Sequence, residues 1–295
     1  MELQPGPIFA ISTAATFAVS QILVRRASYQ SEESFTSLAI SLLIGTPIFV
    51  VLVTVSGQWP AFASFTWQQY VLLGAAGLVH LIIARFLFFN STRIIGANPT
   101  AAITRTSVIF SLVFGVTLLG ESVTAMQVVA ALLIMVGAVL TTTEISRTAF
   151  RISTRGLLMG LGTAICSSGS ATLIRPVMKV TDDIYAATFI MYLAAFIVVL
   201  AILLVRRQQR DLVLRLDRPA FLMLSSAAVF LVVGHLFRFS ALQHSPVSIV
   251  QPLIATIVIF VLFFSWIVNR RIDVFNWRVV AGIVMVLVGV FLIYR

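Results

Sequence analysis

Charged residues and cysteine are scarce in this sequence. Only 10% of its 295 residues are charged and 60% are hydrophobic, whereas an ordinary soluble domain is about 25% charged and roughly 45–50% apolar. A soluble fold of this length could not hide so much apolar surface from water. A bilayer removes the difficulty because it is itself an apolar solvent, so the composition indicates an integral membrane protein.

The sequence lacks the residues that disulfides, metal sites and nucleotide-binding loops require. Cys166 is the only cysteine, which excludes an intrachain disulfide and a cysteine-based zinc site. The sequence holds neither a glycine-rich phosphate loop with a lysine nor a cluster of metal ligands, so we expect no metal, no cofactor and no ATPase activity. Residues 1–7 lack Lys and Arg, and we therefore expect no cleavable signal peptide.

Ten long apolar stretches predict ten transmembrane helices, because about 20 mostly apolar residues cross a bilayer. The predicted spans are residues 7–25, 35–55, 69–91, 98–119, 124–143, 155–178, 184–205, 219–242, 246–268 and 275–294. Asn98 and Ser245 each precede a proline, which is typical of a helix start. The fold class is therefore all-α integral membrane, with loops too short for a separate soluble domain.

The chain repeats itself. Shifting it by 150 residues aligns its two halves, and after the fourth span the shift becomes 152. Matching pairs are Thr13 with Thr163, Ser20 with Ser170, Phe89 with Phe239, and Gly137 with Gly289. We divide the chain into five-helix repeats at residues 1–147 and 152–295. Because five is odd, the second repeat must be inverted in the membrane, and such repeats commonly place a transporter's binding site at their interface.

Positive charge is distributed unevenly between the loops. Arginine carries almost all of it, since Lys179 is the only lysine, and the arginines form no stripe that would bind nucleic acid. Of 20 basic residues, 14 lie in odd-numbered loops, 3 in even-numbered loops or the C-terminal tail, and 3 within spans. The positive-inside rule then predicts cytoplasmic odd loops and both termini outside an inner (plasma) membrane.

Residues 97–102, the Leu-Gly-Glu ending at Glu121 and the glycine-containing stretch 136–140 resemble the drug/metabolite transporter superfamily, specifically its EamA-type ten-helix members. The resemblance covers nearly the whole chain and implies solute transport, often export. The sequence departs from the family at Arg270 and Arg271, where the second half often has its own Gly-Glu. Basic residues are also missing after the second span. The family arrangement, with both termini inside, is the alternative orientation.

Three arginines and two histidines lie well inside the predicted spans, whereas all ten carboxylates lie in loops or at helix ends. They are Arg85, Arg105, Arg238, His80 and His235. A charge at the bilayer centre costs roughly 2.5–3.5 kcal/mol, so each requires a reason. Arg85 and Arg105 are expected about 10 Å from one membrane surface, in a common basic rung. His235 and Arg238 share a helix face, in a second rung near the opposite surface.

These groups predict a binding site for an anionic solute, because guanidinium binds carboxylate or phosphate through two hydrogen bonds. The alternative is that the arginines extend to lipid headgroups or bind helix-end carbonyls. Ser20 and Ser170 belong to polar stripes that either line a cavity or hydrogen-bond neighbouring helices. Gln251, before Pro252, pairs a polar contact with a bend. Glu121 is assigned a helix-end or gating role.

The function that we predict is secondary transport, as an exporter or exchanger of a small metabolite, by alternating access between the two repeats. Its expected partners are the solute and the lipid bilayer, with a homodimer left open. One alternative is a membrane-embedded enzyme or flippase acting on lipid-linked substrates. That enzyme would need paired carboxylates or a Ser-His-Asp set, which the sequence does not offer. The other alternative is a non-transporting membrane assembly protein.

Overall fold

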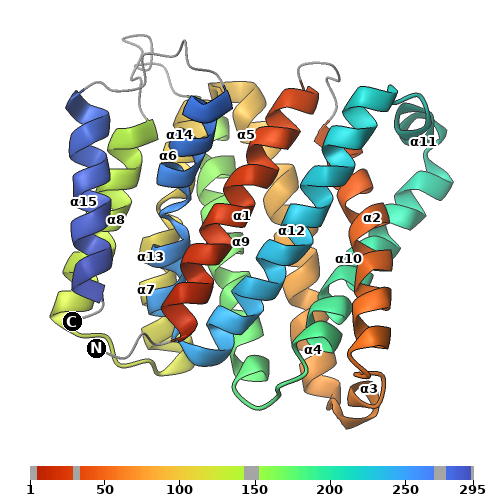
Figure 1. Cartoon of the computed structure of the whole chain (residues 1–295), viewed down its shortest axis with the longest axis horizontal. Helices are drawn as coiled ribbons and strands as arrows, with labels where there is room; N and C mark the ends of the chain where they lie inside the picture. The colour runs from red at the N-terminus through yellow and green to blue at the C-terminus, as the bar shows by residue number, and fades with distance from the viewer. Residues whose placement is uncertain (1–4, 29–33, 143–152, 269–276, 294–295) are drawn as a thin grey trace.

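The computed structural model describes residues 5–28, 34–142, 153–268 and 277–293, and every regular element in these ranges is a helix (Figure 1). The helices, in chain order, are α1 (Pro5–Ser28), α2 (Ser34–Val55), α3 (Ala61–Ser64), α4 (Trp67–Gly77), the π-helical segment η1 (Leu78–Ala84), α5 (Arg85–Ile95), α6 (Ala97–Thr104), α7 (Ser107–Leu119), α8 (Ala125–Thr142), α9 (Thr154–Met178), α10 (Ile184–Val205), α11 (Arg207–Leu214), α12 (Arg218–His244), α13 (Val247–Ile254), α14 (Ile257–Val268) and α15 (Trp277–Ile293).

These elements assemble into the ten predicted spans. Eight helices are long and apolar enough to cross a membrane, and the shorter apolar helices Ala125–Thr141 and Trp277–Ile293 complete the set. The third span runs continuously through α4, η1 and α5, while the fourth is α6 with α7 and the ninth is α13 with α14. The prediction of an all-α, ten-helix membrane protein is confirmed.

The two repeats run in opposite directions and are intertwined. In Figure 1, α1 leads away from the end that holds both chain termini, whereas its repeat counterpart α9 leads toward it. α1 packs along α12 of the second repeat, and α9 packs along α4, η1 and α5 of the first. Each repeat therefore places its first helix against the third span of the other, which is what a twofold axis in the membrane plane requires.

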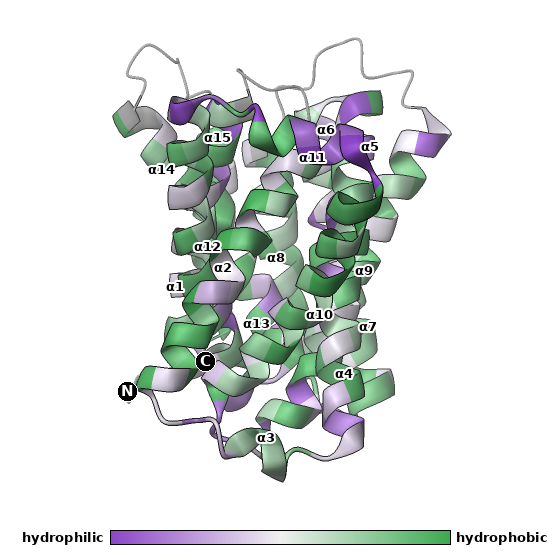
Figure 2. Ribbon diagram, turned by 90° about the vertical axis from the view of Figure 1, so that its right-hand side faces the viewer, coloured by the Kyte–Doolittle hydropathy of each residue, from purple (hydrophilic) through white to green (hydrophobic). Residues whose placement is uncertain are grey.

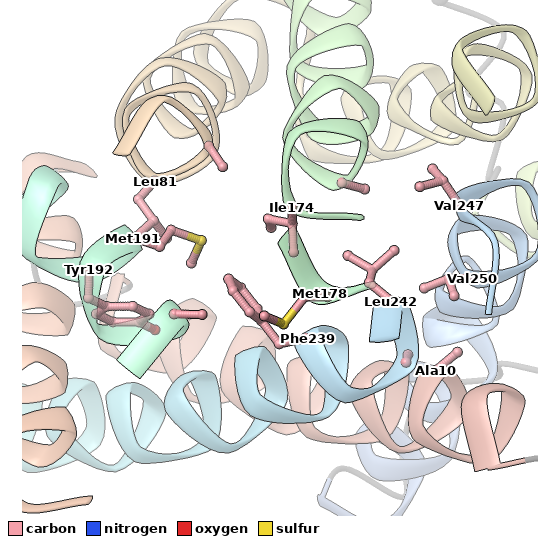
Figure 3. Packing of buried hydrophobic residues seen from close by; sticks show 14 of the residues in the cluster. Ala10, Leu81, Ile174, Met178, Met191, Tyr192, Phe239, Leu242, Val247 and Val250 are labelled. Carbon is pink, nitrogen blue, oxygen red and sulfur yellow. The ribbon is translucent and has the colours of Figure 1, made fainter. Parts of the chain in front are cut away.

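The core is built from both repeats. Figure 3 shows Met178 of α9 beside Phe239 of α12, with Ile174 above them and Tyr192 of α10 to one side. Tyr192 and Phe239 are fully buried. Hydrophilic residues lie mainly at the two ends of the bundle, most densely around α5, α6 and α11, while most of the helical length between them is hydrophobic (Figure 2).

Three spans depart from regular α-helix. The fourth is interrupted at Arg105–Thr106 and the ninth at Ala255–Thr256, which are equivalent positions 150 residues apart. The sequence predicted a bend only near Pro252. The third span carries η1, whose wider turns have no counterpart in α12, where the equivalent residues are regular helix.

Candidate functional site

Two histidines from different repeats meet inside the bundle. His80 lies on η1 and His235 on α12, and their rings stand edge to face with centroids 5.5 Å apart. His235 is fully buried. Short π-helical segments occur frequently at functional sites because they displace side chains from the ordinary helical register. The π-helical turn thus carries one of the two imidazoles of the candidate site.

His235 is held in place through one of its ring nitrogens. Its Nδ1 lies 2.8 Å from the Leu231 carbonyl oxygen and 3.0 Å from the Tyr192 hydroxyl. The ring of Phe17 from α1 approaches it at 5.1 Å between centroids. Its Nε2, by contrast, is buried without a hydrogen-bond partner, as is Nδ1 of His80. Each imidazole therefore has one buried ring nitrogen without a hydrogen-bond partner.

Arg238 lies one turn from His235 on the same helix, as the spacing predicted, and it is 1% exposed. Its Nη2 donates to the carbonyl oxygen of Ser167 over 3.2 Å, and Nε2 of Gln251 donates to the same oxygen over 3.0 Å. Nη1 of Arg238 is buried and has no partner. The arginine is therefore oriented by one backbone contact and keeps a free donor.

Arg85 joins this group instead of forming a separate rung. Its Nη1 donates to the Ser41 hydroxyl over 3.0 Å, and it follows directly after η1, whose His80 meets the ring of His235. Arg85 and His235 are repeat equivalents, and two positions related by a twofold axis can lie close together only near that axis. The expectation of two separate basic rungs, one on each side of the midplane, is therefore wrong. The structure brings the third span, with His80 and Arg85, against His235 of α12. We call His80, Arg85, His235 and Arg238 the central basic cluster.

No carboxylate within the spans balances this charge. Over their described residues, the ten spans contain no Asp or Glu. The cost of burying a charge normally requires a partner of opposite sign.

Arg105 lies apart from the central basic cluster. It is half-buried at the C-terminal end of α6, where the fourth span is interrupted, and its Nε is buried without a partner. The common rung expected for Arg85 and Arg105 stays a prediction, since the bond that fixes Arg85 is to Ser41. Arg105 marks the break in the fourth span.

The two serines bind helices of the opposite repeat. The Ser20 hydroxyl donates to the Ala227 carbonyl of α12 over 2.9 Å, and the Ser170 hydroxyl donates to the Ala76 carbonyl of α4 over 3.2 Å. Ser20 is 5% exposed and Ser170 is fully buried. Of the two interpretations left open by the sequence, these contacts favour hydrogen bonding between helices.

Glu121 closes one end of the repeat interface. Its carboxylate accepts hydrogen bonds from the Val247 N–H (2.8 Å), the Ser248 N–H (3.0 Å) and the Ser248 hydroxyl (2.7 Å), all at the start of α13. The helix-end role expected of Glu121 is therefore visible, but the helix belongs to the other repeat. Nearby, Arg175 donates to the carbonyls of Leu242 and Gln243 at the end of α12. These bonds lie at the end that holds the termini (Figure 1).

Sequence reasoning missed Tyr192, Ser41 and Phe17. Each is an ordinary residue in an apolar span, and its role depends on which helices become neighbours. Tyr192 offered the strongest signal, because a buried tyrosine hydroxyl generally has a hydrogen-bond partner.

Comparisons with known proteins agree with this architecture. The model of the EamA-like transporter family matches twice, over residues 4–143 and 154–295. A solved structure titled only "Crystal structure of protein" superposes with a TM-score of 0.79 at 14% sequence identity, covering 98% of this chain and 95% of the other. That likeness concerns the fold alone. No curated protein matches the sequence.

Proposed function

The chain belongs to the EamA-like transporter family, and from that premise we propose that it carries a small anionic metabolite across the inner membrane, with the central basic cluster as its binding site. Members of this family are membrane transporters. Proteins built from two inverted repeats commonly bind their solute near the bilayer midplane, where the repeats meet. The central basic cluster lies at that interface.

One observation carries the proposal: three buried nitrogen atoms in this cluster have no hydrogen-bond partner. They are Nδ1 of His80, Nε2 of His235 and Nη1 of Arg238. A buried polar atom without a partner costs about 1–3 kcal/mol, and more when it is charged. A carboxylate or phosphate could accept hydrogen bonds from the guanidinium and from imidazole nitrogens that carry a proton. Such an anion would also supply the negative charge that the spans lack.

Alternating access is supported by the contact between the repeats at the end with the termini, where Glu121 of the first repeat caps α13 of the second. Inverted repeats exchange conformations between the outward-facing and inward-facing states, and these bonds would hold that end closed in one of the two states. We further propose that the transporter acts as an exporter or exchanger, as the family resemblance implies.

We also propose that the end with the arginine-rich loops faces the cytoplasm, which places both termini outside. The exposed arginines of the described odd-numbered loops support this orientation through the positive-inside rule. They are Arg25, Arg26, Arg93, Arg155, Arg206, Arg207, Arg210, Arg215, Arg218 and Arg278.

Thermal unfolding of the purified protein in the presence of small carboxylates, phosphate esters and matched cationic metabolites tests the binding proposal. A ligand that binds the folded state alone raises its stability by about 2.7 kcal/mol at 100 times Kd. We expect stabilisation by anions, and an affinity about 10- to 150-fold weaker in Arg238→Gln, because a hydrogen bond to a charged group contributes roughly 1.5–3 kcal/mol.

The matched control is Arg175→Gln. Arg175 is also buried, 8% exposed, but it binds helix-end carbonyls instead of facing the cluster. We expect this variant to lose stability while its affinity for the anion stays the same. Stabilisation by cations alone, or an equal loss of anion affinity in both variants, would contradict the proposal.

A further inference from the structure

The loop between the seventh and eighth spans forms a basic helix on the outside of the bundle. α11 follows α10 directly, and residues 206–218 include five arginines and two aspartates. All five arginines are exposed; they are Arg206, Arg207, Arg210, Arg215 and Arg218. The net charge of +3 is concentrated in 13 residues at the polar end of the molecule, where α11 is labelled in Figure 2.

One face of α11 is anchored to the protein. Leu212 and Val213 are half-buried, and Val213 and Leu216 pack on a small cluster that includes Ala27 and Ile40. This cluster joins the end of α1, the start of α2 and the start of α12. The opposite face carries Arg207, Arg210 and Leu214 outward. α11 is thus amphipathic and held in a fixed orientation, with its basic side unpartnered among the described residues.

Exposed apolar side chains place this basic face at the level of the lipid headgroups. Leu204 and Val205, at the end of α10, are 68% and 81% exposed, and Leu214 is 74% exposed. Apolar side chains this accessible lie in hydrocarbon in a membrane, while arginines within a few residues of them reach the phosphate layer. The headgroup phosphate is the group that planar guanidinium binds through two hydrogen bonds.

The other repeat provides an internal comparison. The element equivalent to α11 is α3, at the opposite end of the bundle, and residues 56–66 around it contain no charged residue. Trp59 and Trp67 flank α3, 46% and 76% exposed, as is typical of an uncharged membrane interface. The same place in the fold therefore carries aromatic residues at one surface and arginines at the other.

We propose that α11 is a docking surface for an anionic phospholipid headgroup in the leaflet at the arginine-rich end. Bound lipid would hold α11 against α2 and the end of α1, because these elements share the small cluster that contains Val213. The lipid would thereby stabilise the folded protein. This proposal does not depend on the identity of the solute.

The test measures how phosphatidylglycerol, added to phosphatidylcholine nanodiscs, raises the unfolding temperature of the full-length protein. An arginine near an anionic surface contributes about 1 kcal/mol, or roughly fivefold in affinity. We therefore expect the triple variant Arg206→Gln, Arg207→Gln and Arg210→Gln to need about a hundredfold more phosphatidylglycerol for half of the stabilisation. The same three positions changed to lysine should retain most of the response.

The matched control removes three exposed arginines of the same end outside α11, by Arg93→Gln, Arg155→Gln and Arg278→Gln. It should lose much less of the lipid response than the α11 variant, because these three arginines lie on three different helices instead of on one segment. Three results would overturn the proposal: an unchanged response in the α11 variant, an equal loss in the control, or equal stabilisation by soluble glycerol phosphate, which would show a free-anion site. If the glutamine variant does not fold, loss of the response in the lysine variant would likewise overturn it.

Discussion

Thr106 and Thr256 close the same turn in the two repeats. Each hydroxyl donates to the carbonyl oxygen three residues earlier, that of Ile103 or Leu253, over 2.7 Å. Each backbone N–H donates to the same oxygen, over 3.0 and 3.1 Å. A bond to the residue three positions back, instead of four, tightens the helix locally. The fourth and ninth spans are interrupted there, and in the ninth span the interruption follows Gln251, which shares the Ser167 carbonyl with Arg238.

Proline does not explain this shared turn. Pro252 precedes the interruption in the ninth span, but the equivalent residue in the fourth span is Ala102. The feature common to both is a threonine whose hydroxyl competes for a helical carbonyl. The repeats therefore share equivalent interruptions, which could serve as hinges in the alternating access that we propose.

The first prediction concerns Glu121. Replacing it by Gln removes the charge that binds three donors at the start of α13, and hydrogen bonds to a charged group contribute roughly 1.5–3 kcal/mol. We expect the end with the termini to open more often. In a Cys166→Ala background, a cysteine at Ser245, which is 2% exposed, should react about tenfold faster or more with a water-soluble maleimide in nanodiscs.

Asp183→Asn is the control for Glu121. Asp183 lies at the same end, but its carboxylate accepts from Thr181 within its own turn and not from the other repeat. Its loss should leave the labelling rate unchanged. An unchanged rate in Glu121→Gln would show that this carboxylate is a passive cap.

The second prediction concerns the contact between α8 and α15. A Cβ added at Gly137 would lie 2.6 Å from the carbonyl oxygen of Gly282 and 2.9 Å from the backbone nitrogen of Val286. These are backbone atoms that cannot rotate away. Gly137→Ala should therefore destabilise the protein by about 1–3 kcal/mol in reversible unfolding.

Gly74→Ala is the matched control, because its nearest neighbour would be the Ala194 Cβ at 3.8 Å. There the higher helix propensity of alanine should leave stability equal, or raise it by up to about 1 kcal/mol. Equal stability of both variants would show that α8 and α15 separate easily.

The third prediction distinguishes packing serines from binding residues. Ser20→Ala and Ser170→Ala each remove one hydrogen bond between helices of opposite repeats, which in membrane proteins contributes about 0.6 kcal/mol on average. We expect a small loss of stability with no change in affinity for the anion. A large loss of affinity, measured by the thermal titration used for Arg238→Gln, would instead place these serines in the solute path.

The repeat pattern explains how far the sequence could predict the site. Equal offsets imply a twofold axis, and the positions of Arg85 and His235 could have been placed near it on that basis. Estimating instead how deep each residue lies along its own helix assigns Arg85 and His235 to opposite sides of the membrane. That estimate does not take into account which helices are neighbours. η1 could not be predicted, since a single π-helical stretch has no distinct residue pattern. Tyr192 became recognisable only when α10 and α12 were seen as neighbours.

The last prediction concerns orientation. The exposed arginines of the described odd-numbered loops lie at the end opposite the termini (Figures 1 and 2), and the positive-inside rule places that end in the cytoplasm. An enzyme tag at the C-terminus that works only outside the cytoplasm should therefore be active, and a fluorescent tag that matures only in the cytoplasm should stay dark. The same tags inserted after Gln208, in the exposed α11, should give the reverse result and serve as the control. Cytoplasmic fluorescence at the C-terminus would give the chain the family's usual orientation. It would also place α11 at the outer surface, where its arginines would face the other leaflet.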